Sequence, residues 1–220
     1  QPYAWGDRNF VAFVARDLPD LGYRTYYIKE ELLPDKESVA EEKKQEPPPE
    51  GFKPVSIERL DGGSVEMNNE FLKVVVDGST GWITSIIDKV NMREMLDGPA
   101  NELKLYRDFT LAYPAWNIDP RYESKPIRIP KEPESIEIID EGPVVCAVVV
   151  KRKLRKSQVA QEIRLFAGRP MVYMVAAVDW RETKAILTAS FKTAKKTDGV
   201  TAEIPYGAIT RPTKRRAKWE

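Results

Sequence analysis

One segment of the sequence, residues 97–119, combines side chains that could bind a sugar. It reads DGPANELKLYRDFTLAYPAWNID and holds two Pro, two Tyr and one Trp beside four acidic residues. Aromatic rings stack on the apolar C–H face of a pyranose, while carboxylates and Asn bind its hydroxyls. The same rings could instead close one end of a folded core, with Tyr113 and Trp116 as a plug. Composition alone favours this second interpretation.

Carboxylates near the ends of apolar runs are the other candidates for chemistry. Glu141, Asp179 and Asp119 occupy such positions. Sugar hydrolysis uses two carboxyl groups that lie about 5 to 10 Å apart. The sequence does not show that any two of these groups face each other, so we interpret most of them as turn or surface residues.

Histidine is absent from the 220 residues. This excludes a Ser-His-Asp or Cys-His arrangement, the HExxH metal motif and a mixed His/Cys zinc site within them. The one cysteine, Cys146, lies in the apolar run PVVCAVVV, which indicates a small buried side chain rather than a reactive thiol. A single cysteine cannot form an internal disulfide, and we expect a reducing, cytoplasmic compartment.

Charge and hydropathy exclude further classes of partner. The 35 basic and 34 acidic residues leave a net charge of +1, so neither nucleic acid nor an anionic membrane surface is expected as a partner. No apolar run approaches the ~20 residues of a membrane helix, and no signal peptide is predicted. The basic run KRKLRK, residues 151–156, is interpreted as a solvated hairpin tip rather than a polyanion site.

The elements that position these residues are predicted to be strands. From Val55 onward, β-branched and aromatic runs alternate with short breaks of Gly, Pro or charge, and no helical apolar period persists. The run NEFLKVVVDGSTGWITSIIDK predicts a β-hairpin around its glycines. Closely spaced strands of this kind predict an all-β antiparallel sandwich over residues 55–220.

Two smaller regions precede the predicted sandwich. Residues 1–33 contain two strand-like runs, FVAFVAR and YRTYYI, and are interpreted as the remainder of a small β-subdomain. Residues 34–54 are rich in charge and contain the triple proline Pro47 to Pro49. This composition predicts an exposed linker with a stiff end.

Several blocks, in this order, resemble the C-terminal half of glycoside hydrolase family 38 α-mannosidases. The blocks are NEFLKVVVDGSTGWITSIIDK, DGPANELKLYRDFTLAYPAWNIDP, GPVVCAVVVKRKLRKSQVAQEIRLFAGRP, VDWRE and GAITRPTK. The run LPDLGYRTYYI is similar to the small β-segment that precedes the large β-domain there. The resemblance implies a galactose-mutarotase-like supersandwich, incomplete at its C-terminus, and a retaining, zinc-dependent exo-α-mannosidase as the parent enzyme.

The resemblance also implies where the chemistry lies. The family's zinc ligands and Asp nucleophile belong to an N-terminal half that has no counterpart here. We therefore expect no catalytic residue and no cofactor in this chain, which by itself is expected to be inactive. Zinc is expected in the catalytic domain, on the same or a separate polypeptide, and that domain and a mannoside are the expected partners.

The family loop that matches LAYPAWNID runs toward the catalytic cleft. The resemblance thus implies that one set of residues lines the sugar site or braces the domain interface: Tyr113, Trp116, Asn117, Asp119 and Arg211. Asn117 stands where an acidic residue is common in the family. The alternative function is a stand-alone carbohydrate-binding sandwich without catalysis, and a mutarotase-like enzyme is disfavoured because that chemistry relies on His.

Overall fold

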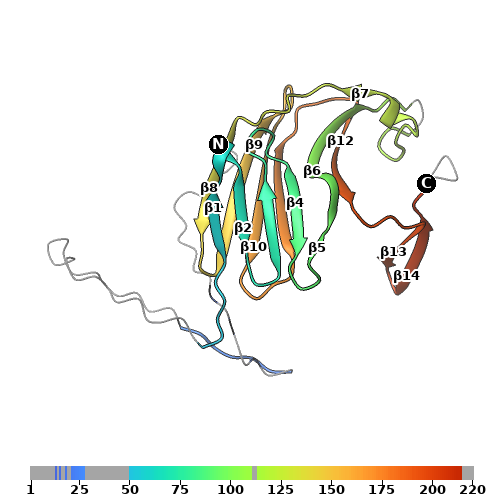
Figure 1. Cartoon of the computed structure of the whole chain (residues 1–220). Coiled ribbons are helices and arrows are strands. Elements are labelled where there is room, and N and C mark those ends of the chain that lie inside the picture. The colour runs from blue at the N-terminus through green and yellow to red at the C-terminus, as the bar shows by residue number, and fades with distance from the viewer. Residues whose placement is uncertain are drawn as a thin grey trace.

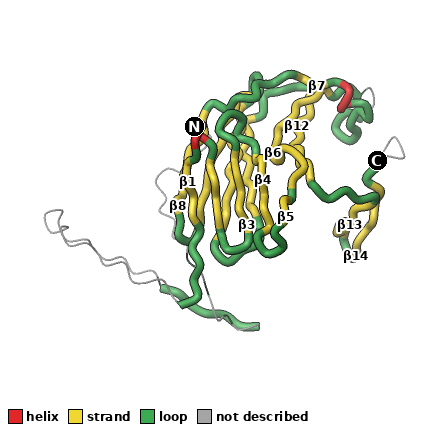
Figure 2. Tube along the Cα trace, viewed as in Figure 1, coloured by secondary structure: helices red, strands yellow, loops and turns green. Residues whose placement is uncertain are grey.

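The structure is a computed structural model that describes residues 13, 15, 18, 21–27, 50–110 and 113–214. These residues form antiparallel strands and two short 3-10 helices, without an α-helix (Figure 1 and Figure 2). Within them, no helix is long and apolar enough to span a membrane. The predicted all-β antiparallel architecture is confirmed.

Two sheets form the body of the molecule (Figure 1). The first contains β1 (Ser56–Arg59), β2 (Val65–Asn68), β3 (Leu72–Val76), β4 (Ile83–Asp88), β5 (Arg93–Glu94), β6 (Leu96–Arg107), β7 (Pro126–Ile127) and β12 (Ala185–Thr193). Its order is β1-β2-β3-β4-β6-β12, with β5 paired to β4 and β7 paired to β6. The 3-10 helices are η2 (Asp61–Gly63) and η3 (Tyr122–Ser124).

The second sheet has the order β11-β10-β9-β8. Its strands are β8 (Ser135–Glu141), β9 (Val145–Lys153), β10 (Gln158–Phe166) and β11 (Val172–Asp179). The core lies between the two sheets because alternate residues of their strands point inward. On β3, for example, Leu72, Val74 and Val76 are buried. Val148 on β9 and Ile163 on β10 meet them from the other side, in one apolar cluster.

A third, two-stranded sheet stands apart from this body (Figure 1). It consists of β13 (Gly199–Ile204) and β14 (Gly207–Pro212). Val200, Ile204 and Tyr206 of this hairpin are exposed. An isolated two-stranded hairpin is marginally stable in water, so its apolar side chains form a surface suited to a packing partner.

The regions predicted before the sandwich fall mostly outside the described residues. Residues 34–49 of the predicted linker, with its triple proline, and most of the run FVAFVAR lie there. Residues 50–54 are described and mostly exposed, as predicted, but Phe52 is partly buried against the core. Residues 21–27 are described and contain no strand, so the strand predicted for YRTYYI is wrong for Tyr23 to Tyr27. Tyr23 and Tyr27 are exposed, and residues 21–27 belong to none of the three sheets.

Candidate functional site

The loop between β6 and β7 carries four of the five residues expected to contact a sugar or a neighbouring domain. Two backbone hydrogen bonds hold its base against the first sheet. The N–H of Asp108 donates to the carbonyl of Lys184 at 2.9 Å, and the N–H of Arg107 donates to the carbonyl of Lys125 at 2.9 Å. Since Lys184 directly precedes β12, the loop starts from a fixed end of the sheet.

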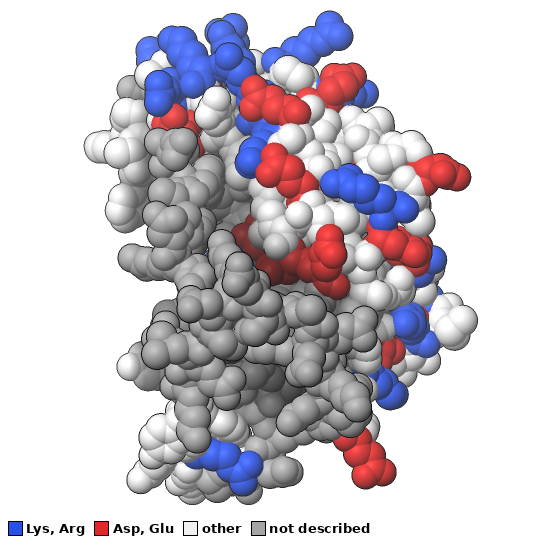
Figure 3. Space-filling model, turned by 90° about the vertical axis from the view of Figure 1, so that its left-hand side faces the viewer, with Lys and Arg blue, Asp and Glu red and all other residues white. Residues whose placement is uncertain are grey.

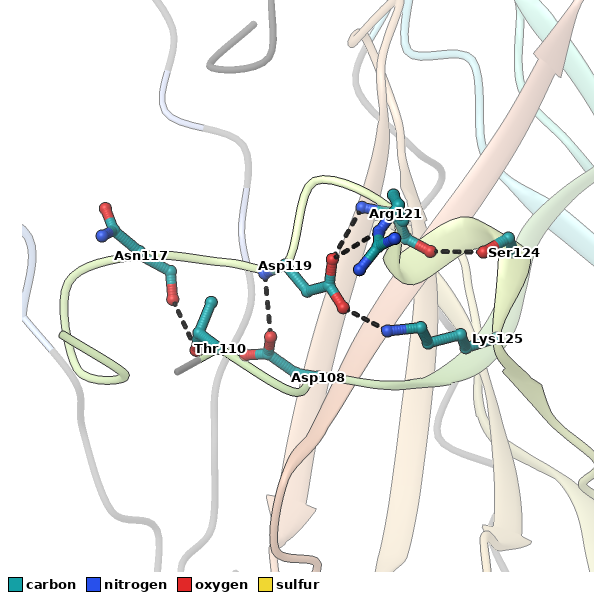
Figure 4. A network of polar contacts seen from close by, with 7 residues as sticks. All are labelled: Asp108, Thr110, Asn117, Asp119, Arg121, Ser124 and Lys125. Atoms are coloured by element: carbon teal, nitrogen blue, oxygen red, sulfur yellow. Dashed lines mark hydrogen bonds and ion pairs between the residues drawn. The ribbon is translucent and has the colours of Figure 1, made fainter. Parts of the chain in front are cut away.

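Asp119 is the centre of a polar network in this loop (Figure 4). It is 3% exposed. Its N–H donates to Asp108 Oδ1 at 2.9 Å, and its Oδ1 accepts from the Arg121 N–H at 3.0 Å. Its Oδ2 accepts from Lys125 Nζ. Both carboxylate oxygens are engaged inside the loop, so Asp119 fixes the loop's shape.

The electrostatics agree with this bracing role. The Lys125 hydrogen bond, followed by the Arg121 backbone N–H, lowers the pKa of Asp119. Ser124 Oγ donates to the Arg121 carbonyl at 2.7 Å, which stabilises the turn at η3. A charged carboxylate with these donors is therefore a permanent feature of the loop at neutral pH.

Tyr113 and Trp116 lie at the tip of the loop. Trp116 is 89% exposed and Tyr113 is 76% exposed. The N–H groups of Trp116 and Asn117 donate to the Tyr113 carbonyl at 2.9 and 2.8 Å, which makes a tight turn. The interpretation of these rings as a plug for the sandwich is wrong, because both rings are largely exposed and belong to neither apolar core cluster.

Asn117 and Arg211 complete the predicted set. Asn117 is exposed beside the two rings, and its carbonyl accepts from Thr110 Oγ1 at 3.5 Å (Figure 4). Arg211 is exposed on β14 opposite Val200, in the separate hairpin. Arg211 thus lies in a different sheet from the strands that carry the loop. The structure therefore brings four of the five residues together and leaves Arg211 elsewhere.

The strand-end carboxylates do not form a catalytic pair. Glu141 ends β8 and Asp179 ends β11, which are the two edges of the second sheet. These strands run in opposite directions, so the carboxylates lie at opposite ends of it as well, and the edges alone are roughly 14 Å apart. Asp179 is also paired with Arg181 Nη2 at 2.7 Å. The described residues contain no group of three His, Cys, Asp or Glu that could hold a metal ion.

Arg152 is a polar residue whose setting the sequence interpretation missed. Most of the basic run is exposed, as predicted, at the end of the molecule where β9 passes into β10. Figure 3 shows Lys and Arg gathered at the upper end of one face. Arg152, however, is 1% exposed. A sequence signal for the burial of Arg152 is the two-residue period of β9, because this period places Val148, Val150 and Arg152 on the same inward face.

Comparison with known proteins gives consistent matches. Residues 67–220 match the family model described as glycosyl hydrolases family 38 C-terminal domain. Alpha-mannosidase G of Dictyostelium discoideum is 30% identical over 179 residues, which are 77% of this chain and 16% of that protein. Alpha-mannosidase 2C1 of Homo sapiens is 27% identical over 185 residues, which are 79% of this chain and 18% of that protein.

A solved structure supports the same fold. An alpha-mannosidase from Enterococcus faecalis aligns with a TM-score of 0.55 and 14% identity, over 75% of this chain and 21% of that chain. At this identity the likeness shows the fold alone. The chain spans about a sixth of the length of the curated relatives that it matches.

Proposed function

Because this chain belongs to the family of glycosyl hydrolases family 38 C-terminal domains, we propose that it is the non-catalytic β-domain of a retaining, zinc-dependent α-mannosidase. It supports an active site that a catalytic domain supplies, on the same or a separate polypeptide, and it contributes to binding of the mannoside. The curated relatives that it matches are named as α-mannosidases.

The observation that carries the proposal is the braced presentation of two aromatic rings. Tyr113 and Trp116 lie three residues apart on a tight turn and face solvent. The network around Asp119 holds the turn in place without help from either ring. Exposed aromatic side chains on a fixed loop suit stacking against a pyranose or packing at the lip of a neighbouring cleft.

The proposal also requires a surface on which the catalytic domain can dock. In the described part of the chain, β11 pairs on one edge only, with β10. Its neighbouring residues Tyr173, Met174 and Val175 are all partly exposed, at 37%, 36% and 45%. Successive residues of a strand point to opposite faces, so β11 is uncovered on both. Contiguous exposed apolar surface of this kind marks interaction sites.

The chain's own residues do not fit a zinc site. It has no histidine, and the described residues gather no metal-ligating group. We therefore place the zinc and both reacting carboxylates in the catalytic domain, where one carboxylate attacks the anomeric carbon and the other serves as acid and base. The buried thiol of Cys146 suits a reducing compartment, and we place the enzyme in the cytoplasm.

The first experiment measures the size of the native polypeptide by immunoblot of source cells, next to the recombinant chain. A band several times heavier supports a domain of a full-length α-mannosidase. A band at the chain's own size, which co-purifies with a histidine-containing polypeptide that has α-mannosidase activity, supports a split enzyme. A lone band whose purified chain binds methyl α-mannoside would replace the proposal by the stand-alone binding module.

The second experiment tests the loop in the assembled enzyme, with p-nitrophenyl α-mannoside as substrate. Trp116→Ala is expected to lower kcat/KM by about tenfold, which corresponds to ~1.4 kcal/mol of lost transition-state binding. Ile139→Ala is the matched control, because Ile139 is also partly exposed but lies on β8, the far edge of the second sheet. Equal kcat/KM for both variants would show that the loop does not face the active site.

A further inference from the structure

A pocket of about 300 Å³ opens where the first sheet is incomplete. One edge of β6 pairs with β12 along its length. The other edge pairs with β4 only at Ala100, and with β7 at Leu105 and Tyr106. Residues 102–104 have no strand partner on that side, so this edge of β6 borders the gap. We call this gap the seam pocket; its lining includes Trp82, Glu102, Lys104, Arg128, Lys131 and Arg152.

Arg152 reaches the seam pocket from β9 of the opposite sheet. Its Nη1 donates to the Lys131 carbonyl at 2.6 Å and its Nη2 donates to the Thr80 carbonyl. Its Nε is buried without a hydrogen-bond partner. Both acceptors are neutral carbonyls, so the hydrogen bonds orient the guanidinium without neutralising it.

In the described part of the chain, no carboxylate forms an ion pair with this buried cation. Burial lowers the pKa of Arg152, and the exposed Glu132 only partly opposes this effect. A buried charge without a partner is strongly destabilising, whereas an opposite charge with good geometry offsets much of the desolvation. The site is thus electrostatically incomplete as the chain alone builds it.

The lining as a whole is positive. Its four basic side chains, Arg152 included, and one acidic side chain give it a formal charge of +3. The one carboxylate, Glu102, is already paired with Lys104 at 3.2 Å, on the same strand. Trp82, Leu105 and Tyr106 add apolar wall, which lowers the local dielectric and strengthens the attraction for an anion.

We propose that the seam pocket binds a small oxyanion, a phosphate or a carboxylate group, whose charge compensates Arg152. Arg128 and Lys131 attract the ligand, since the charge of Lys104 is paired with Glu102, and the open edge of β6 lies beside it. A volume of about 300 Å³ is at the lower end of small-molecule sites. The inference is independent of the loop that carries Tyr113 and Trp116.

The test is calorimetric titration of the 220-residue chain with inorganic phosphate, with acetate and with neutral methyl α-mannoside, at constant ionic strength in chloride. Saturable binding of phosphate or of acetate is expected, and comparison of the two identifies the preferred oxyanion. Binding of the neutral mannoside alone would overturn the proposal, as would the absence of saturable heat with both anions.

Four variants decide whether the anion sits in this pocket. Arg152→Gln is expected to abolish binding, Arg128→Gln to weaken it and Glu102→Gln to strengthen it, the last two by about threefold to tenfold. Lys153→Gln is the matched control, because it removes the same charge from the neighbouring, exposed position of β9. If Arg152→Gln does not fold, the other two variants still test the site, because Arg128→Gln should lower the anion affinity and Glu102→Gln should raise it. Unchanged affinity in both would mean an adventitious ion only.

Discussion

Lys125 Nζ donates a hydrogen bond to Asp119 Oδ2 across the short turn that contains η3. Asp119 is buried and its N–H donates to Asp108 at the start of the loop. Through these two contacts, Asp119 connects the outgoing arm of the loop between β6 and β7, at Asp108, with the returning arm, at Lys125. Tyr113 and Trp116 owe their position to an ion pair in which neither takes part.

The loop is expected to lose order when Asp119 is protonated. Hydrogen bonding to Lys125 lowers the pKa of Asp119 from its ordinary value of 3.8. A carboxylate with a lowered folded pKa stabilises fully above its unfolded pKa, and this stabilisation is lost as the pH falls through the folded value. We expect amide exchange in residues 113–125, corrected for intrinsic rates, to be constant between about pH 7 and pH 5 and to rise below about pH 4.

The variant Asp119→Asn tests whether protonation of Asp119 causes this rise in amide exchange at low pH. The variant keeps the side-chain shape but loses the charge, so its loop amides should exchange faster at neutral pH and show no further acid step. Asp97→Asn is the control, because Asp97 is exposed and its nearest cation, Lys196, is 3.8 Å away. An acid step that persists in Asp119→Asn would assign the pH dependence to another carboxylate.

The strands were predictable because their signal is local. The alternation of buried and less buried residues along β3 is a property of five consecutive residues. The predicted hairpin over NEFLKVVVDGSTGWITSIIDK is confirmed by the ladder from Leu72↔Asp88 to Val76↔Ile83. The burial of Cys146 is confirmed for the same reason, since it lies in the inward row of β9.

The setting of Arg152 was not predictable from its neighbours. A basic run predicts solvation because burying a charge is costly. Its two hydrogen-bond acceptors lie 21 and 72 residues away in the sequence. The exposure of Trp116 is a similar case, because it depends on how Asp108, Asp119 and Lys125 close the loop beneath it. Contacts between distant residues decide both, and a single sequence does not display them.

Gly78→Ala is expected to destabilise the first sheet. A Cβ at Gly78 would lie 2.4 Å from the Gly62 carbonyl oxygen and 2.6 Å from the Ser64 nitrogen, both backbone atoms that cannot rotate away. We expect the free energy of unfolding, measured by urea denaturation, to fall by about 2 to 4 kcal/mol. Gly63→Ala is the control: its φ of +78° is strained for Ala, but nothing lies within 4 Å, so a loss of only about 1 kcal/mol is expected. Equal losses would show that the turn at η2 yields to the added methyl group.

Cys146 is expected to be inert in the folded chain. Burial raises the pKa of its thiol to about 11, and its Sγ lies 3.7 Å from the Ser56 carbonyl oxygen. The reactive thiolate is therefore scarce at about pH 8 and is inaccessible as well. We expect no labelling by a chromogenic disulfide reagent until denaturant unfolds the protein, and then one equivalent. Rapid labelling of the native chain would show that β9 opens without global unfolding.

The edge strand β11, which pairs only with β10, is expected to promote self-association of the isolated chain. Long apolar edge strands pair with other chains unless a charge such as Lys blocks them. The 220-residue chain should therefore bind an apolar dye and self-associate, and Val175→Lys should reduce both. Because Val175 is 45% exposed, the free energy of unfolding should change by less than about 0.5 kcal/mol.

Thr84→Lys separates the effect of the strand from that of net charge. Thr84 is exposed on β4, so this variant adds the same charge in the other sheet. If both variants lower dye binding equally, charge repulsion alone explains the result; if neither does, docking must use another surface, such as the β13–β14 hairpin. A reduction confined to Val175→Lys would identify β11 as the exposed docking edge. The same substitution should then weaken assembly with the catalytic domain, because the strand that binds the dye is the one that the domain would cover.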